Sequence, residues 1–171
     1  STHTAFAVET FIDELAADAG RDPVEYRRAL LKSHPRHLGV LNLAAEKAGW
    51  AEPATRSGNG ARHRGVAVHE SFNSFVAMVV EISLDAQGGF QVERVVIAVD
   101  CGLPINPNII AAQMEGGMAY GLAAALSSEI TLREGAAVQS NFHDYQVLRM
   151  NQMPQVETYI VPSTEPPTGV G

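Results

Sequence analysis

The sequence predicts an α+β fold, in which an N-terminal helical segment precedes a mixed or antiparallel sheet with a glycine-rich helix packed on it. Three observations support this prediction: helical apolar spacing within residues 1–50, apolar alternation within residues 75–99, and an apolar run after residue 106. Helices come first and strands follow, which favours α+β over the regular βαβ alternation of parallel sheets. The 171 residues suffice for one sizeable core, or for two small cores that share an interface.

The first predicted helix has one apolar face. Its apolar residues are spaced three and four apart, as on one stripe of a helix, and they are Ala5, Val8, Ile12, Leu15 and Ala19. Gly20 follows the last of them, at a position where a left-handed C-terminal cap is common. The helix is therefore expected to end just before Gly20.

Two shorter helices are expected before residue 50. Residues 22–25 (DPVE) combine an N-cap acid, a proline at the first helical position and a glutamate at the third, which is a capping-box pattern. This helix should run through Leu31. A third helix should extend from about His37 to Ala48, where Gly49 ends it.

Residues 51–64 (AEPATRSGNGARHR) form the predicted linker or long loop. They are rich in Pro, Gly, Ser and Asn and have no apolar periodicity. The chain is therefore divided into a helical segment at residues 1–50, this linker, and an α+β portion at residues 65–171.

The α+β portion begins with a predicted hairpin. Apolar residues alternate through residues 76–84, turn residues occupy 85–89, and residues 90–99 provide the return strand. Asn106 and Pro107 then open a helix that should run to about Leu126. Further strands are expected near residues 129–133, 138–141 and 156–161.

Composition excludes several classes of function. A net charge of −7 and a pI near 5.3 argue against a nucleic-acid partner, which would favour a basic stripe. No signal segment is recognised, and no apolar run approaches the roughly 20 residues that cross a bilayer, so no membrane span is expected. Cys101 is the single cysteine, which excludes an internal disulfide framework and a multi-cysteine zinc site. The compartment is left open between cytoplasm and periplasm.

The histidines do not indicate a metal site. His34, His37, His63 and His69 have no acidic residues spaced to complete a ligand set, so solvated surface histidines are expected. Pro35 should break any helix at this point, so that His34 and His37 need not share a face.

Cys101 is expected to be a structural thiol. It follows an apolar strand, where a buried and inert cysteine is common. A nucleophile assembled from Cys101, His143 and Asp144 is the less favoured alternative, because it requires all three side chains to be in contact.

Three glycines, Gly116, Gly117 and Gly121, lie inside the last predicted helix. Each costs about 1 kcal/mol of helix stability relative to alanine, so something should approach this part of the helix closely. The first explanation is another helix or sheet packed on the small residues. The second is a large cofactor lying against them, with the amide of Gln113 turned toward it.

The final residues, 166–171 (PPTGVG), are unusually rich in proline and glycine. Such density is typical of a tight turn that brings backbone close to another group. Composition alone favours a disordered tail instead.

Taken together, these motifs resemble the C-terminal part of the large, molybdopterin-binding subunit of the xanthine dehydrogenase and aldehyde oxidase family, in the branch that contains the beta subunit of isoquinoline 1-oxidoreductase. The helical start (THTAFAVE, then FIDEL) is similar as well, so the resemblance covers nearly the whole chain. The matching motifs are VDCG at 99–102, NP at 106–107, QMEGG at 113–117, NFHDY at 141–145, LR at 148–149 and GVG at 169–171.

The resemblance implies a cofactor-binding role for seven residues. Gln113 matches the glutamine of a Gln-x-Glu-Gly motif that hydrogen-bonds the pterin of the molybdenum cofactor. GVG at 169–171 matches the loop leading to the family's catalytic glutamate. The cofactor-binding residues are thus expected to be Gln113, Glu115, Gly116, Gly117, Gly169, Val170 and Gly171, with no metal ligand and no catalytic residue in the chain, since the glutamate would follow Gly171.

The resemblance also implies an activity and partners. The family hydroxylates an N-heterocycle or aldehyde with oxygen from water, and electrons leave through iron–sulfur clusters of a small [2Fe-2S] subunit. Expected partners are the remainder of the large subunit, that small subunit and a small-molecule substrate. The isolated chain is expected to be inactive and to self-associate through an exposed apolar face. The alternative is a noncatalytic assembly or small-ligand-binding module, and a thiol hydrolase built on Cys101 is a distant third.

Overall fold

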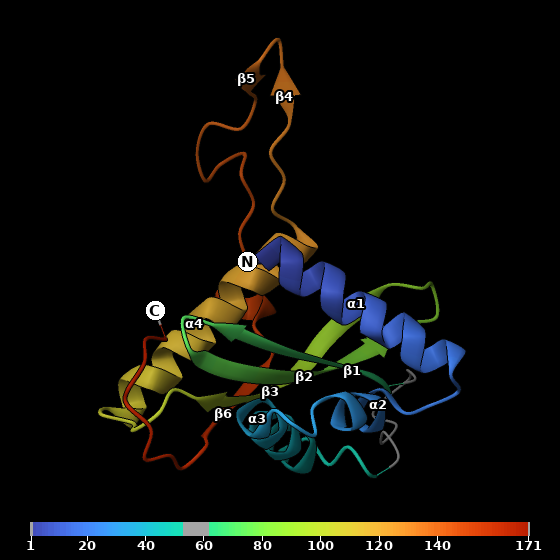
Figure 1. Cartoon of the computed structure of the whole chain (residues 1–171). Coiled ribbons are helices and arrows are strands. Elements are labelled where there is room, and N and C mark those ends of the chain that lie inside the picture. Colours follow the sequence, from blue (N-terminus) through green and yellow to red (C-terminus); the bar gives the residue numbers. More distant parts are fainter. Residues whose placement is uncertain (1, 53–61, 171) are drawn as a thin grey trace.

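The computed structural model describes residues 2–52 and 62–170, and it has the predicted α+β architecture (Figure 1). Three helices come first, followed by three long strands, a long helix, a small hairpin and a last strand. In chain order the elements are α1 (Thr2–Asp18), α2 (Pro23–Leu30), α3 (Pro35–Lys47), β1 (Arg62–Ser71), β2 (Ser74–Leu84), β3 (Phe90–Asp100), α4 (Pro107–Leu126), β4 (Leu132–Arg133), β5 (Ala136–Ala137), a 3-10 turn (Met150–Gln152) and β6 (Gln155–Ile160).

The main sheet is mixed, with strand order β1-β2-β3-β6. β1, β2 and β3 are antiparallel neighbours, and β6 lies parallel to β3. The predicted hairpin of residues 76–99 is confirmed as β2 and β3, and the predicted last strand as β6. The mixed pairing arises because the chain crosses over through α4 before it returns beside β3.

β1 is the element that the sequence pattern did not reveal. Its first three residues, 62–64, belong to the strand rather than to the predicted linker, and residues 53–61 of that linker lie outside the described residues. Only Val66 and Val68 are buried in β1, among histidine, arginine and glutamate. Edge strands tolerate this charge, but it conceals the alternation on which the prediction depends.

The sheet has helices on both faces (Figure 1). α2 and α3 cover one face, and the core there combines Val24, Val40, Leu41, Ala44, Ala45 and Ala48 with Val66, Val68, Phe75, Ala77, Val79, Val96 and Ala98. α4 lies on the other face, where the core combines Ile110, Met114 and Met118 with Val92, Val95, Ile97, Val99 and Cys101. The glycine-rich helix is therefore packed on the sheet, as predicted.

The predicted helix ends are largely confirmed. Gly20 and Gly49 have φ of +60° and +62°, the left-handed conformation of a C-terminal cap. The Asp22 carboxylate accepts hydrogen bonds from the Val24 and Glu25 amides at 2.9 and 3.0 Å. α3 begins at Pro35, two residues before the prediction, since proline is well suited to the first helical position.

Two of the histidines are not solvated surface groups. The rings of His34 and His37 meet edge to face at 5.7 Å, because Pro35 opens α3 between them instead of breaking it. His37 also packs on Phe75 at 4.7 Å, and this burial lowers its pKa. The Nε2 atom of His69 is buried and has no hydrogen-bond partner in the described part of the chain. The prediction of solvated surface histidines is therefore wrong for His37 and His69.

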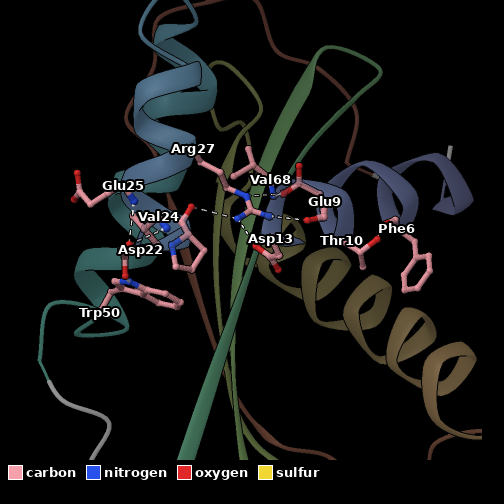
Figure 2. Close-up of polar contacts among 11 residues, drawn as sticks. Phe6, Glu9, Thr10, Asp13, Asp22, Val24, Glu25, Arg27, Trp50 and Val68 are labelled. Carbon is pink, nitrogen blue, oxygen red and sulfur yellow. Dashed lines mark hydrogen bonds and ion pairs between the residues drawn. The ribbon is translucent and has the colours of Figure 1, made fainter. Parts of the chain in front are cut away.

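α1 contacts α2 and β1 mainly through hydrogen bonds and ion pairs (Figure 2). Arg27 of α2 is 2% exposed and donates to the Glu9 carboxylate at 3.0 Å, the Asp13 carboxylate at 2.5 Å and the Glu9 carbonyl at 2.9 Å. The same Glu9 carboxylate accepts from the Val68 amide at 2.7 Å. Only Ala16 of α1 is fully buried, so the predicted apolar stripe is only partly covered.

The segment after α4 forms an arm that projects from the body of the molecule (Figure 1). β4 lies within the strand predicted near residues 129–133, but the strand predicted at 138–141 is wrong. Glu134 and Gly135 have φ of +52° and +81°, and they form a two-residue turn that starts the partner strand already at Ala136.

By length and composition α4 could cross a membrane, which differs from the expectation that no span is present. In the fold, Ile110, Met114 and Met118 of α4 are buried against the sheet. One side of α4 therefore packs on the sheet, while only 22% of its apolar window is buried within the described chain.

Candidate functional site

The last described residues are held tightly against the ends of β2 and β3. The Thr168 amide donates to the Cys101 carbonyl at 2.8 Å. The Ser74 hydroxyl lies 2.7 Å from the Thr168 hydroxyl and donates to the Gly169 carbonyl at 2.6 Å. The disordered-tail interpretation of this segment is therefore wrong, and the tight-turn interpretation is confirmed for residues 166–170.

Gly102 allows this close approach. Its φ is +72°, and a Cβ atom added there would lie 2.1 Å from the Pro166 carbonyl oxygen. The Leu103 amide next to it donates to the Glu165 carbonyl at 2.9 Å. Only glycine satisfies both the conformation and the space at this position.

A buried ion pair fixes the turn that carries Gly102. Arg36 of α3 holds Asp100 with two hydrogen bonds, Nε to Oδ2 at 2.8 Å and Nη2 to Oδ1 at 2.7 Å. Oδ1 also accepts from the Gly102 amide at 3.0 Å. The hydrogen bond with Arg36 lowers the pKa of Asp100 and raises the pKa of Arg36, so both groups remain charged at neutral pH. The helix on one face of the sheet thus positions the chain end on the other.

Cys101 is a buried structural thiol, as predicted. It is 2% exposed within the α4-side core, and this burial raises the pKa of the thiol. A raised pKa disfavours the nucleophilic thiolate. His143 lies on the arm, where its side chain is exposed and faces Asp144 at 3.5 Å. The structure therefore does not assemble a nucleophile from these three residues.

A cavity of about 580 Å³ opens beside the C-terminal segment on the α4 face of the sheet. Its walls come from three places: the paired ends of β1 and β2 with the turn between them, the middle of α4, and the C-terminal segment. The lining residues are His69, Ser71, Phe72, Ser74, Val76, Met114, Gly169 and Val170. Two residues with a predicted site role, Gly169 and Val170, therefore share one cavity.

The other predicted residues lie on α4. Gln113, Gly116 and Gly117 are exposed and share one side of the helix, while Met114 turns toward the sheet. Glu115 is exposed too, but two residues rotate it by roughly 200° from Gln113. Gly171 lies outside the described residues.

The glycines of α4 face open space. A Cβ atom added at Gly116, Gly117 or Gly121 would meet no atom within 4 Å. In the described parts of the chain, 2–52 and 62–170, no helix or sheet packs on them, so the first explanation offered for these glycines finds no support. Their free surface is available to a group from outside the chain.

Sequence reasoning missed the cavity wall formed by His69, Ser71, Phe72 and Ser74. These residues lie in β1, its turn and the start of β2, the region where the strand itself was missed. Asn73, just before the alternating residues 76–84, was the available signal, because asparagine favours two-residue hairpin turns.

Comparison with known proteins assigns a family to this arrangement. Residues 11–154 match the family described as the molybdopterin cofactor-binding domain. The chain is 37% identical over 96% of its length to the beta subunit of isoquinoline 1-oxidoreductase from Brevundimonas diminuta. It is 33% identical over 98% of its length to a nicotinate dehydrogenase subunit from Pseudomonas putida. The chain spans only 21% and 15% of these two relatives.

A solved structure supports the same assignment. The Cu,Mo-CO dehydrogenase in its carbon-monoxide-reduced state superposes with a TM-score of 0.50 and 29% identity, over 56% of this chain and 12% of that chain. The family match covers well over half of the sequence, and the expected resemblance is confirmed. The chain belongs to the molybdopterin cofactor-binding domain family.

Proposed function

We propose that this chain forms one wall of the molybdenum cofactor site in an oxidoreductase that hydroxylates an N-heterocycle or an aldehyde with oxygen from water. One observation supports the proposal above all: the side of α4 that carries Gln113, Gly116 and Gly117 is unoccupied by other described residues. The names of the relatives, isoquinoline 1-oxidoreductase and nicotinate dehydrogenase, support the substrate class.

The residues present fit one side of such a cofactor. A flat ring system can approach a helix closely where side chains are missing, as at Gly116 and Gly117. The Gln113 amide is exposed and offers a donor and an acceptor. The described lining of the neighbouring cavity has no charged side chain, so the cofactor's phosphate requires groups from elsewhere in the complete protein.

The chain's own contribution is binding and positioning. When bound, the cofactor would supply the two-electron redox chemistry. Gln113 would orient the cofactor by hydrogen bonding. Ser74 fixes the Gly169 carbonyl, and Val170 packs on the α4-side core, which holds the approach to Gly171 in place. Such fixed backbone is what a preorganised site needs, and no catalytic residue is assigned within the chain.

The proposal includes partners, which are the remainder of a large subunit and a small [2Fe-2S] subunit. Several large apolar side chains on α1, α4 and the arm are exposed, and they are Phe6, Phe11, Ile109, Tyr120, Leu132, Phe142 and Met150. A stable monomer rarely exposes so many, so this surface is suited to contact with other protein. The relatives are about five to seven times longer than the chain, which is consistent with this.

A noncatalytic ligand-binding module is the second candidate. The cavity beside the C-terminal segment favours it, because described residues of this chain alone line a volume typical of a small-molecule site. This module would bind a ligand without molybdenum.

The experiment compares Gly117→Leu with Gly39→Leu in the complete protein that contains this chain. Neither glycine has an atom within 4 Å of an added Cβ, and both lie in helices, so both variants should fold. Gly117→Leu should lower bound molybdenum at least about tenfold, measured by elemental analysis, because the side chain occupies the cofactor's approach. Gly39→Leu should retain it.

Gln113→Ala extends the comparison, with Gln87→Ala in the exposed β2–β3 turn as its control. Loss of one charge-free hydrogen bond should weaken cofactor retention about fivefold, from a contribution of about 1 kcal/mol. Equal molybdenum content in all four variants would contradict the proposal and favour the noncatalytic module.

A further inference from the structure

The main sheet has two edge strands, β1 and β6, which the described residues protect unequally. An edge strand presents free amide and carbonyl groups that pair readily with another chain. On β1 the outward Val68 amide donates to the Glu9 carboxylate of α1 at 2.7 Å. The same strand carries Arg62, Arg64 and Glu70, and charged side chains disfavour pairing at an edge. β1 is therefore protected against a further strand.

β6 lacks these protective features. In the described parts of the chain it pairs with β3 alone, and this pairing runs without a bulge. The strand (QVETYI) contains no lysine, arginine or proline. Its charged residue, Glu157, accepts hydrogen bonds from Arg94 Nε at 2.7 Å and from the Tyr159 hydroxyl at 2.8 Å. The six residues of β6 thus form a regular edge without an unpaired charge.

The pairing with β3 determines which backbone groups of β6 face outward. The Val161 amide donates to the Val99 carbonyl at 2.8 Å, so it faces β3. Because backbone groups alternate in direction along a strand, the amides of Glu157 and Tyr159 face β3 as well. The remaining amides and carbonyls point away from β3, and they belong to Val156, Thr158 and Ile160.

This outward edge is complementary to itself. If an antiparallel copy of β6 is placed with a two-fold axis at Thr158, each Val156 lies opposite Ile160 of the second copy. Both residues pack on the α4-side core, so the apolar surface continues across the axis. Glu157 lies opposite Tyr159 of the second copy, and these two groups already hydrogen-bond within one chain. A two-fold interface requires such self-complementarity.

Thr158 provides an independent observation. Its Oγ1 atom is buried and has no hydrogen-bond partner in the part of the chain that the structure describes. In the antiparallel arrangement the two Thr158 residues lie directly opposite, with Cα atoms about 5.5 Å apart. Threonines in such positions commonly share a hydrogen bond, and rotation of χ1 toward the edge would give this hydroxyl its partner.

We infer that β6 pairs antiparallel with β6 of a second copy of this chain, about a two-fold axis at Thr158. Two four-stranded sheets thereby become one continuous sheet. The inference goes beyond the proposed function and does not depend on it, because β6 lies at the opposite edge of the sheet from the strand β1 that lines the cavity.

The first test measures amide exchange in the 171-residue chain carrying Ile109→Glu and Tyr120→Glu, which removes two exposed apolar side chains of α4. The outward amides of residues 156, 158 and 160 should be protected at least about tenfold more strongly at high than at low protein concentration, since dimers form by mass action. The amides of Glu157 and Tyr159 should be protected equally at both concentrations, because β3 binds them within one chain.

The second test exchanges charge at the two-fold axis in the same background. Thr158→Lys and Thr158→Glu should each abolish the dimer in sedimentation equilibrium, because like charges would lie directly opposite. Mixing the two variants should restore a heterodimer that associates at least about tenfold more tightly than either variant alone. Gln155→Lys and Gln155→Glu are the controls, since residue 155 is exposed and lies away from the axis, and each should still dimerise.

Three results would overturn the inference: exchange at residues 156, 158 and 160 that does not depend on concentration, a Thr158→Lys chain that dimerises as its background does, or folded variants that form no heterodimer on mixing. Strong protection at every concentration would show instead that the same chain covers the edge. Circular dichroism checks the fold of each variant. The exchange measurement leaves β6 unchanged, so it decides the inference even where a charged variant does not fold.

Discussion

The two faces of the sheet differ in how completely the chain covers them. On the α3 face the central residues of β2 and β3 have no exposed surface, and they are Ala77, Val79, Val96 and Ala98. On the α4 face the β2 residues remain partly exposed, and they are Val76, Met78, Val80 and Ile82. On that face Val95, Ile97 and Val99 of β3 are buried beneath α4, so the difference lies over β2. We call the α3 face closed, and we call the α4 face open because it leaves apolar surface of β2 and a cavity uncovered.

The two faces also differ in their charged residues. Glu81, 4% exposed, is surrounded by Arg64 at 3.0 Å, Arg62 at 3.5 Å and Arg94 at 3.6 Å. The α3 side also holds the Arg36–Asp100 pair. The described cavity lining on the α4 side has no charged residue. The α3 face thus combines apolar packing with ion-paired charges.

The largest expected effect concerns the open side. The isolated chain should self-associate into dimers or larger species at high concentration, since Ile109 and Tyr120 of α4 are 58% and 77% exposed. Replacing both with glutamate should shift the chain toward monomer in sedimentation equilibrium. Leu30→Glu, at a 54% exposed position of α2, should not. If the isolated native chain is monomeric at every concentration, the α4 face does not act as an uncovered contact surface.

The next prediction tests whether Arg36 on the α3 face positions the C-terminal segment on the α4 face through Asp100. Asp100→Asn should destabilise the chain by about 1.5–3 kcal/mol, the usual contribution of hydrogen bonds to a charged group. Arg36 and the Gly102 amide both bind this carboxylate, so its loss should also loosen residues 165–168. Amide exchange at Thr168 would measure that loosening. An exposed carboxylate, Glu14→Gln, is the control.

The same residue predicts a pH dependence. The folded-state pKa of Asp100 is lowered by Arg36, so its stabilising contribution is present above the unfolded-state pKa of about 3.9. That contribution is lost as the pH falls from there through the lower folded-state value. The free energy of unfolding should therefore decrease more steeply below about pH 4 in the native sequence than in Asp100→Asn. If the free energy of unfolding falls equally with pH in both proteins, the Arg36–Asp100 pair does not contribute to the pH dependence of stability.

The helices and the central strands were more predictable from the sequence than the edge strand β1 and the C-terminal segment. Apolar periods of 3.6 and 2 predicted α1, β2 and β3, and helix start and stop signals predicted α2, α3 and α4. β1 was missed because an edge strand with histidines and arginines lacks a clear period. The C-terminal segment was ambiguous because composition does not reveal a partner such as Ser74, 94 residues earlier in the chain. Long-range hydrogen bonds of this kind have no local signature.

The smallest effect decides what the glycines of α4 are for. Gly116→Ala should stabilise the isolated chain by about 0.4–1 kcal/mol, because it restricts the unfolded chain and an added Cβ meets nothing within 4 Å. Gly102→Ala should instead destabilise it, since φ is +72° and the Pro166 carbonyl occupies the space. Thermal unfolding of both variants measures the contrast. If Gly116→Ala is more stable, folding does not require glycine on this face, and the remaining reason for it is a group that the chain binds there. If it is less stable, the open face is already used by the chain itself, and the difference between the two sides of the sheet is one of degree.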